Sequence, residues 1–216
     1  PNLRWSTCLG LPKYWNDRHE PLHLADKLFL NEEENEYNII EVKNKKYDLK
    51  YISLVPYYLE YTELYDKYEE LTEEEFFLEL AKQLSKEYHR KQVDKGGVDY
   101  FSGHITSVVN GVDTIEEKTV AYLHDTAEDT KLTYVDLMVL DFSDRVINAV
   151  IALTKDKKES YKDYLKRVKS NELARAVKLS DLTNNMDLSR LKEITEVDKK
   201  RLEKYKKAYK YLKEQD

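Results

Sequence analysis

The sequence predicts an all-α fold from residue 72 to the C-terminus, preceded by an N-terminal extension of a different character. Two observations favour this fold class. Apolar residues recur every three or four positions in most segments after residue 72, which is the spacing of one helix face. Two of these segments also begin with Thr-x-x-Glu or Thr-x-x-Asp, a pattern typical of a helix N-terminus. We therefore expect residues 72–216 to form a helical bundle and residues 1–71 to be a separate extension.

The helices are expected to begin at Thr72, which forms a capping box with Glu75. This first helix should run to about Lys91, and its buried face should consist of Phe76, Phe77, Leu80, Ala81 and Leu84. Others are predicted near residues 101–110, 115–128, 133–140, 160–169 and 172–185. Ser143 is a candidate N-cap for one more, and Thr195 with Asp198 begins the last. Gly96 and Gly97 indicate a loop over residues 94–99.

The N-terminal extension, residues 1–71, has no assigned role. Tyr37–Val42 and Tyr47–Ile52 alternate partly between apolar and polar residues and flank Lys43–Lys46, which favours a short β-hairpin. Tyrosines between residues 57 and 68 recur at helical spacing, a pattern more typical of packing than of ligand stacking. The extension could be a lid, an oligomer interface or a partner-binding arm, and the sequence leaves these alternatives open.

Composition excludes several classes of function. The net charge of −6 argues against a large nucleic-acid surface, which needs a basic stripe. No apolar run approaches the roughly 18 residues of a membrane span, and no signal-peptide pattern opens the chain. A single cysteine, Cys8, cannot form an internal disulfide and is consistent with a reducing compartment. We therefore expect a soluble cytoplasmic protein that acts on a small molecule.

The segment with the clearest chemistry is His124–Thr130, which reads HDTAEDT. It places an imidazole beside the carboxylate of Asp125 and adds a second acidic pair, Glu128 and Asp129. On a continuous helix, residues four apart share a face, so this segment could present nitrogen and oxygen ligands together with spare carboxylates. A divalent metal with an activated water needs groups of these kinds. A solvated polar helix end is the alternative.

Two residues outside that segment support a metal site. His104 follows the segment Tyr100–Gly103, and Asp181 is an acid on a mostly apolar predicted helix. A buried carboxylate costs several kcal/mol unless it is paired or bound to a cation, so Asp181 needs a metal or a salt bridge to Lys178 or Arg190. Imidazoles and carboxylates without a thiolate suit one divalent cation, manganese foremost, with iron or zinc as alternatives.

Several segments, in order and spacing, resemble the HD-domain phosphohydrolase superfamily, and within it the RelA/SpoT-like hydrolases and small alarmone hydrolases. The resemblance covers roughly residues 75–212. The matching segments are His89–Gln92 with Asp94–Gly97, Tyr100–His104, Leu123–Thr130, Leu153–Lys155, Lys178–Asp181 and Asn185 with Met186.

The resemblance implies an HD-domain helical bundle that hydrolyses a phosphate or pyrophosphate group of a nucleotide, foremost a (p)ppGpp-like alarmone. It implies a role for each matched residue. The implied metal ligands are His104, His124, Asp125 and Asp181. Glu128 and Asp129 fall on the acids that position or deprotonate the attacking water, and Lys95 and Asn185 fall on positions that hold substrate. Arg90 is a further candidate for charge balance on phosphate, or a surface residue.

One departure from the family pattern bears on specificity. Many alarmone hydrolases have an arginine before the matched lysine, where it packs on the guanine base, and this chain has Asp94 there. An acid at this position is expected to repel a nearby phosphate and to weaken guanosine alarmone binding.

Other functions remain open at this stage. The substrate could instead be a nucleoside triphosphate, NADPH or a pyrophosphorylated RNA end. In a different class, the site could sense a nucleotide without turnover, or the chain could be an antitoxin-like interaction protein that acts through residues 1–71.

Overall fold

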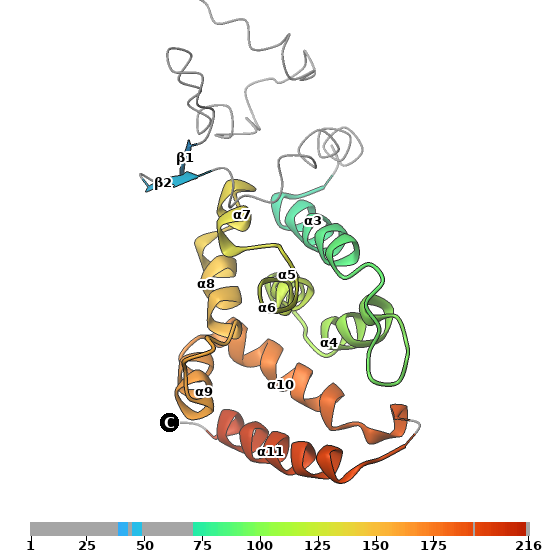
Figure 1. Ribbon diagram of the computed structural model, residues 1–216. Coiled ribbons are helices and arrows are strands. Elements are labelled where there is room, and N and C mark those ends of the chain that lie inside the picture. The colour runs from blue at the N-terminus through green and yellow to red at the C-terminus, as the bar shows by residue number, and fades with distance from the viewer. Residues whose placement is uncertain (1–38, 43–44, 49–70, 192, 215–216) are drawn as a thin grey trace, which may run out of the picture. The chain divides into compact units, whose positions relative to one another are not determined.

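The computed structural model describes residues 39–42, 45–48, 71–191 and 193–214 (Figure 1). The described chain divides into two compact units. One contains a β hairpin and Val135–Phe142, which holds most of α7 (Tyr134–Val139). The other, Thr72–Tyr134 with Ser143–Asp216, contains the remaining helices. Whether residues 1–71 and 72–216 act as separate domains stays a prediction.

The predicted hairpin is present. Its strands β1 (Ile39–Val42) and β2 (Lys45–Asp48) are antiparallel, with Ile39 opposite Asp48. The second strand begins at Lys45 rather than at Tyr47, because Val42 pairs directly with Lys45. Two lysines that were expected in the turn, Lys45 and Lys46, therefore belong to the strand. The predicted helix of tyrosines between residues 57 and 68 lies outside the described residues.

Helix α3 (Glu73–Tyr88) forms as predicted, with a complete capping box between Thr72 and Glu75. Its buried residues include Phe76, Leu80 and Leu84, which lie on the face that the sequence predicts. This face packs along α5 (Ile115–Leu123), which begins with a capping box of its own. Burial of apolar side chains at roughly 25 cal/mol per Å² therefore holds the first helix against the helix that leads into the HDTAEDT segment.

The expected continuous helix over residues 115–128 is wrong, because the chain breaks at His124 and Asp125 between α5 and α6 (Thr126–Asp129). At this break, two side chains bond backbone carbonyls that backbone N–H groups bond in a regular helix. His124 Nδ1 bonds the carbonyl of Ala121 at 2.7 Å, and Thr126 Oγ1 donates to the carbonyl of Leu123 at 2.7 Å. Such local bonds compete with the helical ladder.

The segment before it is also irregular. Residues 101–105 form a π-helix, η3 (Phe101–Ile105), which continues into α4 (Thr106–Asn110). A π-helix inserts extra backbone into a helical turn and often occurs at functional sites. Here it carries His104.

The C-terminal half consists of α8 (Asp144–Leu153), α9 (Tyr161–Lys169), α10 (Glu172–Met186), the short 3-10 helix η4 (Leu188–Arg190) and α11 (Glu196–Lys213). Ser143 caps α8, and Thr195 with Asp198 forms the capping box of α11, as predicted. Helix α10 packs along α11 on one side and contacts α4, α5, α8 and α9 on the others (Figure 1). Helix α10 therefore has neighbouring helices on most of its faces. No helix among the described residues is long and apolar enough to cross a membrane.

A close contact between α4 and α10 gives a stability prediction. A Cβ atom built on Gly111 would lie 2.1 Å from Ser180 Oγ, which itself donates to the carbonyl of Val108 at 2.8 Å. We expect Gly111→Ala to lower the free energy of unfolding by roughly 1–3 kcal/mol, because the buried hydroxyl has to move. Adding Ser180→Ala should recover part of that loss, measured by urea denaturation. Strictly additive losses in the double variant would contradict this explanation.

Candidate metal centre

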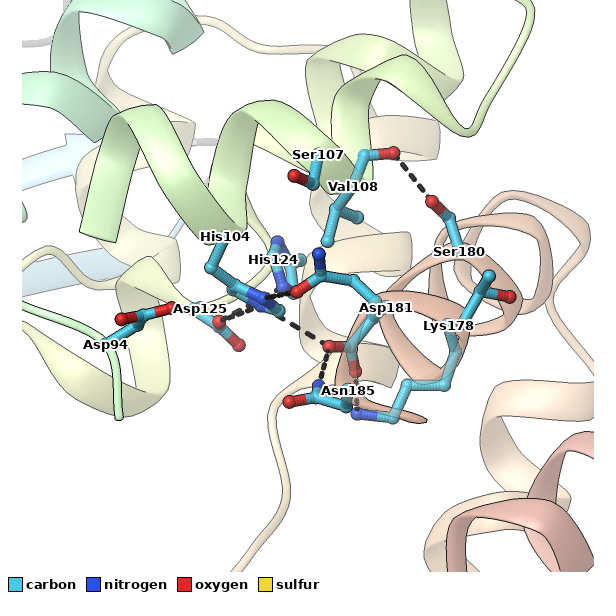
Figure 2. Close-up of polar contacts among 12 residues, drawn as sticks. Asp94, His104, Ser107, Val108, His124, Asp125, Lys178, Ser180, Asp181 and Asn185 are labelled. Carbon is cyan, nitrogen blue, oxygen red and sulfur yellow. Dashed lines mark hydrogen bonds and ion pairs between the residues drawn. The ribbon is translucent and has the colours of Figure 1, made fainter. Parts of the chain in front are cut away.

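Three buried side chains from separate elements converge in the helical unit. His104 comes from η3, His124 ends α5, and Asp181 comes from the middle of α10. One ligand atom of each lies within 4.8 Å of the others, so the three could hold a metal ion. Figure 2 shows the imidazole of His104 between the carboxylates of Asp125 and Asp181.

The outer nitrogen of each histidine is occupied. His124 Nδ1 lies 2.7 Å from the carbonyl oxygen of Ala121, and His104 Nδ1 lies 2.7 Å from Asn184 Oδ1. Both partners are acceptors, so in a neutral ring Nδ1 carries the hydrogen and Nε2 carries the lone pair. This arrangement fixes the tautomer of a metal-binding histidine and its ring orientation.

Asp125 faces the inner nitrogen, Nε2, of both His104 and His124. Its Oδ2 atom lies 3.0 Å from His124 Nε2 and 3.3 Å from His104 Nε2. The same oxygen accepts a hydrogen bond of 2.7 Å from the hydroxyl of Tyr100. The Tyr100 ring is in turn packed between the rings of His104 and the buried His89, with centroids 5.1 and 5.2 Å away. Asp125 is thus brought to two of the other predicted ligands, His104 and His124, and is held there by the Tyr100 hydroxyl.

Asp181 is held by two donors. Lys178 Nζ lies 2.6 Å from Oδ2, and the Asn185 amide donates to Oδ1, which lies 3.3 Å from His104 Nε2. The Lys178 salt bridge, considered as an alternative to metal binding, is present together with the cluster. An isolated buried carboxylate costs several kcal/mol. The lysine offsets part of that cost and leaves Oδ1 facing the histidine.

The electrostatics of the cluster are those of a cation site. Burial lowers the pKa of His104, but the carboxylates of Asp125 and Asp181 outweigh it and raise the pKa to about 10. Burial raises the pKa of Asp125, but the charges and hydrogen bonds of His124 and His104 outweigh it and hold the pKa well below its usual range. The carboxylates therefore favour a positive charge at this position, either a proton on His104 or a bound cation in its place.

The donor chemistry fits a divalent transition metal. Two imidazole nitrogens face carboxylate oxygens across about 3 Å, an arrangement that is favourable only with a proton or a cation between them. His124 Nε2 is buried and faces Asp125 Oδ2 at 3.0 Å. Imidazole and carboxylate ligands without sulfur suit manganese, iron or open zinc sites.

The two acids proposed as the base lie one turn beyond the cluster on α6. Glu128 and Asp129 are both exposed, and Glu128 Oε2 accepts from the backbone N–H of Lys155 at 3.3 Å. Partial burial and the charges of Asp125 and Glu128 raise the pKa of Asp129. A carboxylate with a raised pKa is a better proton acceptor than an ordinary one.

A pocket of about 260 Å³ opens beside His104. It is lined in part by Lys95 and Asn185, two of the predicted substrate-binding residues. Lys95 is half exposed and forms an ion pair with Asp198. Arg90, the third, is not brought to this pocket, because its side chain is exposed and its guanidinium lies 3.6 Å from Glu87. The structure therefore places Arg90 at the surface.

Asp94 is paired within the protein, and the expected repulsion of phosphate by this acid stays a prediction. Its Oδ1 atom accepts from the backbone N–H of Val98 at 3.0 Å, and its Oδ2 atom accepts from Arg190 at 2.9 Å. The Asp94 pKa is lowered by these partners against the effect of burial, which raises it. An acid neutralised by an adjacent guanidinium does not present an uncompensated charge to a phosphate. The sequence did not reveal this because Arg190 lies far along the chain.

Other pocket residues were missed by sequence reasoning. Arg201 and Tyr205 line the pocket from α11, where they lie four residues apart. That spacing was the available signal, since residues four apart share a helix face. Tyr100 belonged to a matched segment but had no role assigned to it.

The Tyr100 hydroxyl gives a test of how Asp125 is held. Tyr100→Phe keeps the ring between the two histidines and removes only the bond to Asp125 Oδ2. Because partners of metal ligands typically contribute 10–100-fold to metal affinity, we expect Mn²⁺ binding to weaken by roughly 10-fold. Calorimetric titration of metal-stripped protein measures this effect. Tyr134→Phe, a change at an exposed tyrosine, is the control, and equal affinities for both variants would contradict the assignment.

Comparisons with known proteins support the fold. No protein-family model and no curated protein matches the chain in sequence. Among solved structures, the chain is similar to a metazoan ortholog of SpoT, which hydrolyzes ppGpp and plays a role in starvation responses. The TM-score is 0.53 at 22% identity, and the match covers 63% of this chain and 85% of that one. The predicted all-α helical bundle is therefore confirmed, and its fold is that of this ppGpp-hydrolysing protein.

Proposed function

We propose that this protein is a metal-dependent phosphohydrolase that acts on a nucleotide, with a (p)ppGpp-like alarmone as its substrate. One observation carries the proposal. Two histidines with fixed tautomers direct their inner nitrogens at the carboxylates of Asp125 and Asp181, next to a pocket lined by both cationic and acidic side chains. The fold it shares with a ppGpp-hydrolysing protein and the neutralised charge of Asp94 support the choice of substrate.

His104, His124, Asp125 and Asp181 would hold the cation, foremost Mn²⁺. When bound, such a metal lowers the pKa of water from about 15.7 toward neutrality and polarises a phosphoryl oxygen. The remaining work falls to the protein's own side chains. Asp129 or Glu128 accepts the proton of the attacking water, and the raised pKa of Asp129 favours it for this role.

The pocket cations hold the phosphate groups. The Lys95 ammonium forms an ion pair with Asp198 through one of its three N–H groups. The other two N–H groups can donate to an anionic ligand. Arg201, on the neighbouring turn of α11, lines the same pocket. Positive charges placed before the reaction stabilise the charge that develops on phosphoryl oxygens. The ring of Tyr205 offers an apolar surface to the nucleoside part of the ligand.

A nucleotide panel tests this proposal. The full chain, loaded with Mn²⁺, is incubated separately with ppGpp, the dNTPs, NADPH and a triphosphorylated RNA oligonucleotide, and products are identified by mass spectrometry. We expect pyrophosphate release from ppGpp to be fastest. Faster phosphate release from NADPH, or faster cleavage of a dNTP or of the RNA end, would replace the alarmone as substrate. Absence of any turnover by metal-loaded protein would favour a nucleotide sensor or an interaction protein.

A further inference from the structure

An ion pair at the far side of the pocket is joined to the metal centre by an unbroken series of hydrogen bonds. Arg190 donates through Nη1 to Asp94 at 2.9 Å and through Nη2 to Asn185 Oδ1 at 3.2 Å. The Asn185 amide nitrogen donates to Asp181 Oδ1, the oxygen 3.3 Å from His104 Nε2. Asp181 and Asn185 are drawn together in Figure 2. The Asp94–Arg190 pair thus contacts the cluster through one amide.

The loop that carries Asp94 packs closely against the backbone of Arg190. A Cβ atom on Gly96 would lie 2.6 Å from the carbonyl oxygen of Arg190, so a side chain there would push the loop away. The Asp94 carboxylate is oriented by Val98 N–H at one oxygen, which leaves the other for the guanidinium. Asp94 is 6% exposed and Arg190 is 22% exposed, so both charges are largely shielded from solvent. Such a pair is stronger than one on the surface and has a fixed geometry.

Arg190 acts on the amide of Asn185. The amide oxygen faces a cation and the amide nitrogen faces a carboxylate, and the reverse orientation would place donor against donor and acceptor against acceptor. Without Arg190, the oxygen end of the amide would lose its charged partner, and the side chain could turn toward the pocket. Asp181 Oδ1 would then lose the donor that opposes the pull of Lys178 on Oδ2.

We propose that Arg190, fixed by Asp94, is a positioning residue that sets the orientation of Asp181 at the metal centre through Asn185. The inference rests on the proposed function, since it requires that Asp181 bind a metal. It gives Asp94 a structural role in this chain, where the family resemblance implies an arginine that contacts the base. Loss of Arg190 should therefore weaken metal binding although Arg190 itself contacts no metal ligand directly.

The test measures Mn²⁺ affinity of metal-stripped full-length protein by electron paramagnetic resonance, which reports free Mn²⁺. We expect Arg190→Met to weaken binding roughly 10-fold or more, the range for partners of metal ligands. Arg190→Lys should recover part of this loss, because its ammonium can still reach an acceptor. Arg201→Met is the control, because it removes a cation from the same pocket without breaking the series, and it should retain the parent affinity for Mn²⁺.

A double-mutant cycle separates positioning from a general effect of charge. Once Asn185→Ala has removed the link, adding Arg190→Met should weaken Mn²⁺ binding no further. A thermal melt shows whether Arg190→Met folds. If it does not, Asp94→Asn takes its place in the cycle and is measured with and without Asn185→Ala. Parent-like affinity in the single variant, or additive losses in the cycle, would overturn the inference alone. If the parent protein binds no Mn²⁺, both the inference and the proposed function are overturned. If the parent binds Mn²⁺ and the cycle gives the expected result, but the protein hydrolyses no nucleotide, only the proposed function is overturned.

Discussion

Replacing both acids of α6, as Glu128→Gln with Asp129→Asn, should abolish most turnover while the protein keeps its fold and its metal. The amides have the size of the acids but cannot accept the proton of the attacking water. General acid–base groups typically contribute 10²–10⁴-fold, and we expect a loss of turnover in that range, measured as initial rates of ppGpp hydrolysis at saturating Mn²⁺. A double variant within a few-fold of the parent would exclude both residues as the base.

The single variants should distinguish the two acids. Burial and the charges of Asp125 and Glu128 raise the pKa of Asp129, so the fraction of it that can accept a proton grows as pH rises through that value. Glu128→Gln removes one of the repelling charges. We therefore expect the acidic limb of the pH–rate profile to shift to lower pH in Glu128→Gln, and the rate to fall much further in Asp129→Asn. An unshifted limb in Glu128→Gln would assign the limb to another group.

The second large effect concerns metal content. Asp181→Ala and His124→Ala should each lose the bound metal, because each removes one ligand of the cluster. We expect affinity for Mn²⁺ to fall by more than the roughly 100-fold upper range for partners of ligands. Elemental analysis of the purified variants checks this outcome. Full metal content in both variants would show that the ion is bound elsewhere.

Asp181→Ala also leaves Lys178 buried without its partner. Breaking a buried pair by removing one member costs about 3–5 kcal/mol of stability. The double variant Asp181→Ala with Lys178→Met provides the matched control, since it removes the unpaired charge as well. It should regain much of the stability but none of the metal. Metal that returns with stability would mean that Asp181→Ala acts through unfolding rather than through a lost ligand.

The features that the sequence predicted well depend on neighbours along the chain. Thr72 with Glu75 and Thr195 with Asp198 form their capping boxes within one helical turn, so the residues themselves carry the information. The break at His124 was not predictable in this way. It depends on side chains of His124 and Thr126 that bond backbone carbonyls, in a segment whose composition is equally suited to a helix.

The candidate site shows the same division. Family resemblance placed His104, His124, Asp125 and Asp181 together. The structure brings His104, His124 and Asp181 within reach of one another, and it brings Asp125 to the two histidines. The bond of Tyr100 to Asp125 and that of His104 to Asn184 could not be inferred, because each joins distant parts of the chain. Asp94 meets Arg190 across 96 positions, and a sequence alone gives no reason to pair them.

Restoration of activity by metal tests the central claim most directly. Metal-stripped full-length protein is titrated with Mn²⁺ while bound metal and ppGpp hydrolysis are measured in the same samples. We predict no turnover without metal, and a rate that rises in proportion to occupancy until one ion is bound per chain. Hydrolysis by the stripped protein, or full occupancy without turnover of any nucleotide in the panel, would contradict the account.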